Sequence, residues 1–238
     1  MVESLLRPED FESDDQLREY LCRRFPTQRQ NLTVGPYEFD FLAVADPHDH
    51  MESLMGEEVD GDYQWEPFWA QAWPSADLLA RWMLDQNVRG KPDWSNAWVL
   101  DLGCGVGLNG CLAAAKNARV TFADYAEPSI LFAALNSWPW RHRVDARVVD
   151  WHRDTLDQSY DVILGADIVY EQRNWESLDR IFRMHLRSKG EVWLTEPGRE
   201  TGQQVQPFLE DRGWSVFPRE LATLDNGRPL RLLVLRLE

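Results

Sequence analysis

Short apolar segments alternate with amphipathic segments through the second half of the chain. Strand-like runs rich in apolar residues occur at residues 98–102, 119–123, 146–149, 160–164 and 191–195. Helical spacing of apolar residues occurs between and after these runs, at residues 108–117, 127–138, 172–187 and 203–212. Short strands that alternate with helices favour a parallel sheet with helices on both faces. We therefore expect an α/β fold with a doubly wound sheet.

The last part of the chain departs from this alternation. Residues 214–218 and 229–237 are both strand-like, and no helical segment separates them. The loop between them contains Asn226-Gly227, a pair that favours tight turns. We therefore expect the mostly parallel sheet to end in a C-terminal antiparallel hairpin.

The first part of the chain has a weaker pattern. Residues 7–25 have apolar positions at helical spacing, and residues 37–41 alternate apolar and acidic side chains as a half-buried strand does. Residues 46–62 are acidic and contain proline and glycine, which indicates a loop. Ser75 is placed to cap a helix that extends to about residue 86.

A chain of 238 residues has the length of one domain with a single large core. We expect residues 97–238 to form that core, and residues 1–96 to form an N-terminal extension with helical and strand segments and a substrate-side lid. The sequence has no apolar run long enough to span a membrane, and its start lacks the pattern of a signal peptide. No membrane association is therefore expected.

Charge and cysteine content restrict the partners. The formal net charge of −15 would repel nucleic acid and attract a substrate with a basic side chain, although the acidity could serve only solubility. Three cysteines without a Cys-x-x-Cys pair argue against a disulfide framework or a zinc site and favour the reducing cytoplasm. His48 and His50 flank Asp49 without an obvious third ligand, so no metal site is expected.

Residues 99–107, with the sequence VLDLGCGVG, carry the clearest chemical signal. Gly103, Gly105 and Gly107 follow an apolar strand and precede a helix, which allows a tight turn and the close approach of a ligand to bare backbone. The N–H groups at the start of the helix are available to that ligand. Asp101 lies two residues before the first glycine, where a carboxylate suits a cationic ligand.

A dinucleotide site is the main alternative for this motif. Gly105, Gly107 and Gly110 match the spacing Gly-x-Gly-x-x-Gly, and Asp124 lies about twenty residues further on. Three features favour a methyltransferase instead: Asp101 would repel a pyrophosphate, a long segment precedes the motif, and the expected hairpin closes the sheet.

Acidic side chains also follow the next two strand-like runs, at the strand ends where ligands gather in such sheets. Asp124 can accept hydrogen bonds from both ribose hydroxyls of a nucleoside, or it can cap the helix near Glu127. Asp150 and Trp151 combine a carboxylate with an aromatic plane, which suits the amine and the ring of adenine.

These motifs, together with residues 165–170 (GADIVY), resemble the family-16 seven-β-strand methyltransferases, class I enzymes that depend on S-adenosylmethionine. Residues 68–74 (FWAQAWP) are similar to the branch that methylates the β-subunit of electron transfer flavoprotein. The resemblance covers about residues 65–195. It implies a seven-stranded Rossmann-like sheet and methyl transfer from S-adenosylmethionine to a protein lysine, with S-adenosylhomocysteine as the product.

The resemblance also implies roles for individual residues. Those expected at the cofactor are Trp73, Asp101, Gly103, Gly105, Gly107, Asp124, Asp150, Trp151 and Ala166. Asp167 and Tyr170 are expected where the methyl donor and the acceptor meet. A buried carboxylate beside an ammonium favours the charged form, so we expect Asp167 to orient the acceptor while the proton leaves through water. The alternative is an ordinary strand-to-helix junction, in which Asp167 caps the helix and Tyr170 packs.

Two other functions remain open. The same core would support a small-molecule N- or O-methyltransferase, because a fold does not fix its substrate. A non-catalytic binding protein could also keep this fold, although the intact glycine motif with Asp101 and Asp124 argues against it.

Overall fold

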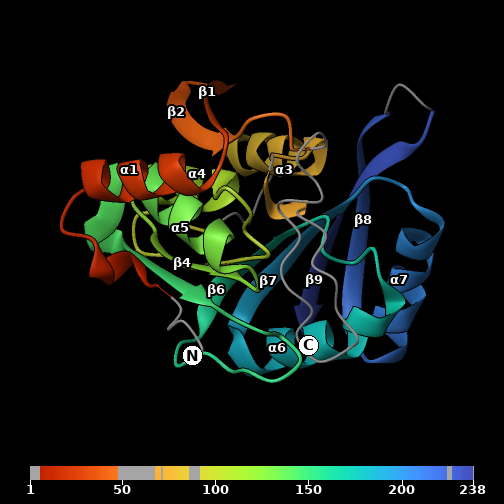
Figure 1. Cartoon of the computed structure of the whole chain (residues 1–238). Coiled ribbons are helices and arrows are strands. Elements are labelled where there is room, and N and C mark those ends of the chain that lie inside the picture. The colour runs from red at the N-terminus through yellow and green to blue at the C-terminus, as the bar shows by residue number, and fades with distance from the viewer. Residues whose placement is uncertain (1–5, 48–67, 71, 86–91, 224–226, 238) are drawn as a thin grey trace.

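The computed structural model describes residues 6–47, 68–70, 72–85, 92–223 and 227–237. At its centre lies a seven-stranded sheet in the order β5-β4-β3-β6-β7-β9-β8 (Figure 1). The strands are β3 (Trp98–Leu102), β4 (Arg119–Asp124), β5 (Val144–Val148), β6 (Tyr160–Ala166), β7 (Leu186–Glu196), β8 (Trp214–Thr223) and β9 (Pro229–Leu237). The five strands β3 to β7 are parallel, whereas β9 pairs antiparallel with both β7 and β8. The expected α/β fold, with its C-terminal antiparallel hairpin, is confirmed.

Helices cover both faces of this sheet (Figure 1). They are α1 (Asp14–Arg24), α3 (Pro74–Leu84), α4 (Leu108–Ala115), α5 (Glu127–Asn136), α6 (Trp175–His185) and α7 (Glu200–Asp211). Short 3-10 turns occupy Pro8–Asp10, Phe68–Ala70, Trp138–Arg143 and Gln172–Asn174. Helices α1, α3, α4 and α5 share one apolar cluster with one face of the sheet, and α6 and α7 share a second cluster with the other face.

The strands reach both clusters because successive side chains point to opposite faces of a sheet. Val99 belongs to the first cluster and Leu100 to the second, and Val162 and Ile163 divide in the same way. A strand buried on both faces has a continuous apolar sequence, which is why these strands were predicted from their apolar runs. Strand β3 has the predicted bounds.

Strand β8 is longer than the sequence indicates. It continues through Pro218, which pairs with Leu233 of β9, and ends at Thr223. Proline is tolerated here because β8 is the last strand of the sheet, and an edge strand needs no partner for every N–H group.

Two helix starts differ from the sequence predictions. Helix α1 begins at Asp14 rather than near residue 7, because the Ser13 hydroxyl caps it by accepting from the Gln16 N–H at 3.2 Å. The prediction of Ser75 as a cap is wrong: α3 begins at Pro74, and Ser75 lies buried inside its first turn. The carbonyl of Ser75 accepts a hydrogen bond from the Thr195 hydroxyl at 3.0 Å, which ties α3 to β7.

A second, two-stranded sheet consists of β1 (Thr27–Val34) and β2 (Tyr37–Val44), paired antiparallel. Strand β1 was not predicted, because its sequence TQRQNLTV is mostly polar and lies largely exposed. Strand β2 extends past the predicted residue 41 into a buried segment. There the amide of Asn136 in α5 bonds both the N–H and the carbonyl of Leu42, at 2.8 and 3.0 Å.

Several expectations fall on other parts of the chain. Most of the acidic segment 46–62, the histidines at positions 48 and 50, and Asn226 lie outside the described residues. Within the described residues, no helix combines the length and the apolar character that a membrane span requires. The division at residue 97 stays a prediction, although Leu17 and Leu21 of α1 belong to the same apolar cluster as α5.

Candidate active site

The carboxyl ends of β3, β4 and β6 lie next to one another in the sheet. Asp101 of β3 pairs with Phe122 of β4 and with Leu164 of β6, so the loops that follow these strands meet at one edge. In an open α/β sheet this edge is where ligands bind. The parallel register therefore brings together residues that are far apart in the sequence.

The turn after β3 requires glycine at positions 103 and 105. Gly103 and Gly105 have φ angles of 65° and 53°, in the left-handed region that side chains disfavour. A Cβ on Gly103 would lie 2.6 Å from Cγ2 of Ile168, and one on Gly105 would lie 3.3 Å from the carbonyl oxygen of Trp69. The turn is thus packed between the loop after β6 and the segment that precedes α3.

Asp101 is almost fully buried beneath this turn. Its Oδ2 accepts a hydrogen bond from the Gly110 N–H in the first turn of α4, at 2.8 Å. Burial raises the pKa of the Asp101 carboxyl to about 7, and repulsion from Asp124 adds to the rise while the bond from Gly110 opposes it. A cation bound beside Asp101 would favour its ionised form.

Asp124, the last residue of β4, contacts the same turn. Its Oδ2 accepts from the Gly105 N–H at 3.0 Å, and its Oδ1 accepts from the Ala126 N–H at 3.1 Å. Burial also raises the pKa of this carboxyl, although the bonds from Gly105 and Ala126 lower it. Asp124 is not the N-cap of α5 that the alternative expected: Ala126 holds that position, and its N–H ties Asp124 to the residue before the helix.

Asp150 and Trp151 follow β5 and lie in the same region. The Trp151 ring is 3.7 Å from the position that a Cβ on Gly103 would take, so it borders the glycine turn. Asp150 accepts from the His152 N–H at 2.9 Å, and its Oδ2 is 3.7 Å from Nε of Arg153. The structure thus places an aromatic plane against the turn with a carboxylate next to it in the chain.

Asp167 follows Ala166, the last residue of β6. Its φ angle of 57° is in the left-handed region, and its N–H donates to the Thr195 carbonyl at 2.8 Å. The side chain is 8% exposed, and its Oδ1 accepts from Nη1 of Arg199. Burial raises the pKa of Asp167, while the hydrogen bond and the charge of Arg199 lower it. Asp167 thus forms an ion pair with Arg199, and this side-chain hydrogen bond does not cap a helix.

Tyr170 and Trp73 belong to one aromatic group with Phe68. The Phe68 ring lies edge-on to the rings of Tyr170 and Trp73, with centroids 5.7 and 5.9 Å away, and Trp73 Nε1 donates to the Phe68 carbonyl at 2.7 Å. The guanidinium carbon of Arg199 is 5.8 Å from the centroid of the Tyr170 ring. This group links the segment before α3 to the loop after β6.

Arg199 is the site residue that the sequence reasoning missed. It precedes α7 in the run Glu196-Pro197-Gly198-Arg199, directly after β7. The available signal was its place after the carboxyl end of a parallel strand, where functional side chains collect. A lone arginine has no motif, so only the structure shows that it contacts Asp167.

Solved structures share this fold. The chain superimposes on a TehB-like S-adenosylmethionine-dependent methyltransferase from Corynebacterium glutamicum with a TM-score of 0.54 and 18% identity, covering 71% of this chain and 89% of that one. An N-methyltransferase, NodS, from Bradyrhizobium japonicum, crystallised with S-adenosylhomocysteine, superimposes with a TM-score of 0.52 and 15% identity, covering 68% and 98%. The predicted seven-stranded methyltransferase fold is confirmed.

Sequence relatives have narrower names. The chain is 32% identical to protein N-lysine methyltransferase METTL21A of Xenopus tropicalis, over 59% of this chain and 65% of the relative. It is 33% identical to histone-arginine methyltransferase METTL23 of Xenopus laevis, over 58% and 61%. It is 28% identical to the electron transfer flavoprotein beta subunit lysine methyltransferase of Danio rerio, over 56% and 51%. The match thus spans about half to two thirds of these relatives.

A family model described as lysine methyltransferase matches residues 65–210, which is more than half of the chain and includes the glycine turn, Asp167 and Arg199. The cofactor expected from the sequence, S-adenosylmethionine, is the cofactor of this family. The chain belongs to the lysine methyltransferase family.

Proposed function

We propose that this protein transfers a methyl group from S-adenosylmethionine to a lysine side chain of a protein substrate. The observation that carries the proposal is the position of Asp167, a buried carboxylate paired with Arg199, whose guanidinium also lies near the Tyr170 ring of the aromatic group. Ile168, the next residue, contacts the glycine turn, so an acceptor held by Asp167 would be near a ligand of that turn.

The residues around the turn fit S-adenosylmethionine. Two carboxylates with raised pKa contact the turn and the helix after it: Asp124 accepts from the Gly105 N–H and Asp101 from the Gly110 N–H. A ligand with a positive charge and hydroxyl groups would satisfy both carboxylates, whereas a pyrophosphate would be repelled by them. This electrostatic argument supports the methyl donor over a dinucleotide.

Each cofactor-site residue has a role in this proposal. Asp101 and the glycine turn, with Gly103, Gly105 and Gly107, hold the amino-acid end, and Asp124 accepts from the ribose hydroxyls. Asp150 and Trp151 hold the adenine, while Trp73 and Ala166 border the cofactor. When bound, the cofactor supplies a methyl group on a sulfonium, so the protein's own contribution is mainly the alignment of the acceptor.

Asp167 and Tyr170 orient the acceptor amine in this proposal. Asp167 accepts hydrogen bonds from the amine, and the Tyr170 ring forms a wall whose face attracts positive charge. The net charge of −15 favours the approach of a basic protein segment and disfavours nucleic acid. The three cysteines are free, which supports a reducing compartment such as the cytoplasm.

The test is incorporation of labelled methyl groups. The protein is incubated with S-adenosylmethionine labelled on the methyl group and a heat-treated cell extract, and the labelled proteins are then hydrolysed to amino acids. We expect the label in methylated lysine and a strongly reduced signal with Asp167→Asn. Label in methylarginine would contradict lysine as the acceptor and indicate arginine, the residue type in the names of the histone-arginine relatives. Label in small molecules alone would contradict the proposal and support the small-molecule alternative.

A further inference from the structure

A buried carboxylate in the acceptor site creates a chemical problem. A lysine arrives as an ammonium, but only its neutral amine has the lone pair that takes a methyl group. An unpaired aspartate would stabilise the ammonium and oppose the loss of its proton. Asp167, with a side chain only 8% exposed, would have this effect if it stood alone.

Asp167 does not stand alone, because Arg199 is paired with it. Nη1 of Arg199 donates to Oδ1 of Asp167, and the guanidinium lies 5.8 Å from the centroid of the Tyr170 ring. An arginine keeps its charge throughout the working pH range, so the guanidinium does not lose a proton to Asp167. The carboxylate therefore has a permanent countercharge that belongs to the protein.

Arg199 is held in place by the turn that precedes it. Gly198 has a φ angle of 65°, and its N–H donates to Oε2 of Glu196 at 2.7 Å. Glu196 is 1% exposed and is paired with Nε of Arg231 on β9. A Cβ on Gly198 would lie 2.5 Å from the carbonyl oxygen of Pro229, so the turn is also packed against the start of β9. This support fixes the origin of the Arg199 side chain.

We propose that Arg199 is a positioning residue that neutralises Asp167, so that the acceptor amine can occupy the site without its proton. The inference rests on the proposed lysine methylation. With Arg199 present, Asp167 can still accept hydrogen bonds from the amine, because a carboxylate has more than one acceptor position. Without Arg199, the carboxylate and the amine together retain one extra proton. If the proton is on the amine, it occupies the nitrogen lone pair; if it is on the carboxyl, it is donated to that lone pair in a hydrogen bond.

Within the part of the chain that the structure describes, no other charged group of this turn or of β9 is paired with Asp167. Among the described residues, Arg199 is the charged group that affects the ionisation of Asp167. Glu196 of β7 and Arg231 of β9 are paired with each other, and Glu200, at the start of α7, is exposed. Removing the charge of Arg199 therefore leaves Asp167 without a countercharge from these elements.

The test compares the pH dependence of methyl transfer in Arg199→Gln, Arg199→Lys and the wild type. The matched control is Arg183→Gln, because Arg183 is also 36% exposed and pairs with the buried Asp179 of α6, outside the candidate site. Incorporation of label from S-adenosylmethionine into the heat-treated extract is followed from about pH 6 to about pH 10. Thermal unfolding and calorimetry with S-adenosylhomocysteine report folding and cofactor binding. Arg199→Met serves if the glutamine variant does not fold.

We expect Arg199→Gln to shift the rising limb of the pH–rate profile to higher pH by about one pH unit or more. The rate at pH 7 should then fall about tenfold and recover at alkaline pH. Arg199→Lys should keep a midpoint near that of the wild type, and Arg183→Gln should lower thermal stability without moving the midpoint. A second readout needs no turnover: the pKa of the Asp167 carboxyl, followed by carbon NMR in the free protein, should rise in Arg199→Gln.

Three results would overturn the inference. An unchanged midpoint with a lower rate would make Arg199 purely structural, and a higher rate at every pH would show that Arg199 obstructs the acceptor. An unchanged carboxyl pKa in Arg199→Gln would show that the pair has no electrostatic effect. Failure of the wild type to label protein is a different outcome, because it contradicts the proposed function itself and this inference with it.

Discussion

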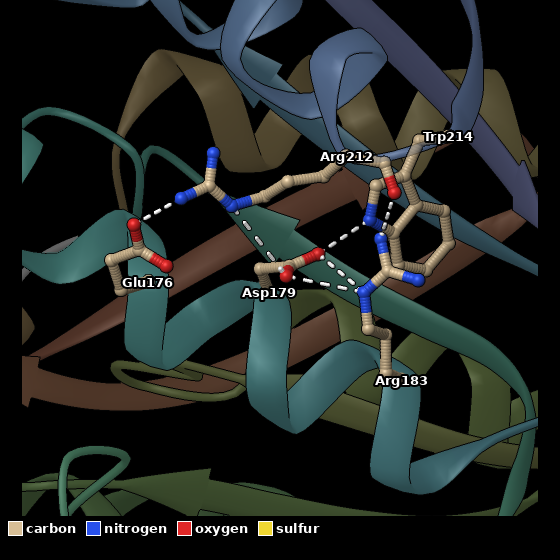
Figure 2. Close-up of polar contacts among 5 residues, drawn as sticks. All are labelled: Glu176, Asp179, Arg183, Arg212 and Trp214. Atoms are coloured by element: carbon tan, nitrogen blue, oxygen red, sulfur yellow. Dashed lines mark hydrogen bonds and ion pairs between the residues drawn. The ribbon is translucent and has the colours of Figure 1, made fainter.

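Two aspartates of this structure are buried beside arginines, and they differ in how completely they are bonded. Asp179 of α6 is surrounded by side chains from α6, from the end of α7 and from β8 (Figure 2). Its oxygens accept from Nε of Arg183 at 3.0 and 3.1 Å and from Nε1 of Trp214 at 2.6 Å, and Nε of Arg212 is 3.8 Å away. Asp167 receives one side-chain hydrogen bond from the described residues, from Arg199.

The difference separates a structural carboxylate from a candidate functional one. The Asp179 network joins α6 to α7 and β8, and Arg212 extends it to Glu176 (Figure 2). The acceptor positions of Asp179 are occupied by donors of the protein, so replacing Asp179 should lower the free energy of unfolding. Asp167 has its charge matched by Arg199 while acceptor positions remain for another donor. A ligand can therefore bind Asp167 but would have to displace a protein contact at Asp179.

The largest expected effect belongs to the structural carboxylate. Asp179→Ala leaves Nε of Arg183 and the buried indole N–H of Trp214 without their acceptor, although Nη2 of Arg183 keeps the Arg212 carbonyl, and the loss should cost about 3 kcal/mol. Denaturant unfolding should show this loss, while the methyl-transfer rate per folded molecule stays near that of the wild type. A variant that keeps its stability but loses activity would contradict the structural assignment.

Asp167→Asn should produce the opposite result. Asparagine keeps the shape and tolerates the left-handed backbone at this position, so the fold should be preserved. Loss of the carboxylate misplaces the acceptor and should lower kcat by roughly 10²-fold. The measurement is labelled methyl transfer at saturating cofactor, with calorimetry showing unchanged cofactor affinity. Full activity in this variant would leave Asp167 with a structural role only.

Asp124→Ala should act on cofactor binding. It removes the proposed acceptor for the ribose hydroxyls and frees the N–H groups of Gly105 and Ala126, so the affinity should fall by roughly 1–3 kcal/mol. Isothermal calorimetry with S-adenosylhomocysteine gives the value. Because Asp124 also contacts Ala126, the N-cap residue of α5, circular dichroism must show that this helix persists. An unchanged affinity would refute the ribose assignment.

The smallest expected effect is a pH dependence of cofactor binding that originates at Asp101. Its pKa of about 7 lies above the unfolded value of 3.8, so the free protein loses stability from this group as pH rises between those values. A cationic ligand favours the ionised form. Affinity should therefore fall about tenfold from pH 8 to pH 6, with about one proton released on binding near pH 6. Asp101→Asn should abolish this dependence, and a flat profile in the wild type would disprove the coupling.

Local patterns predicted strands β3, β4 and β6 well, because each is short, mostly apolar and buried on both faces. The glycine turn was equally predictable, since the conformations at Gly103 and Gly105 leave little room for other residues. Strand β1 was missed because its polar sequence has no period and owes its conformation to pairing with β2. The prediction of Ser75 as a helix cap was wrong because α3 already begins at Pro74, and proline fits the first position of a helix.

The sequence by itself determined the order of strands and helices, the turn that follows β3, and the acidic residues at the strand ends. These depend on local periodicity and on the conformations that glycine alone adopts readily. Only the tertiary structure decided which charges meet: Arg199 reaches Asp167 across thirty-two positions of the chain because β6 and β7 are adjacent and parallel. Contacts of this kind follow from strand register, which no single segment encodes.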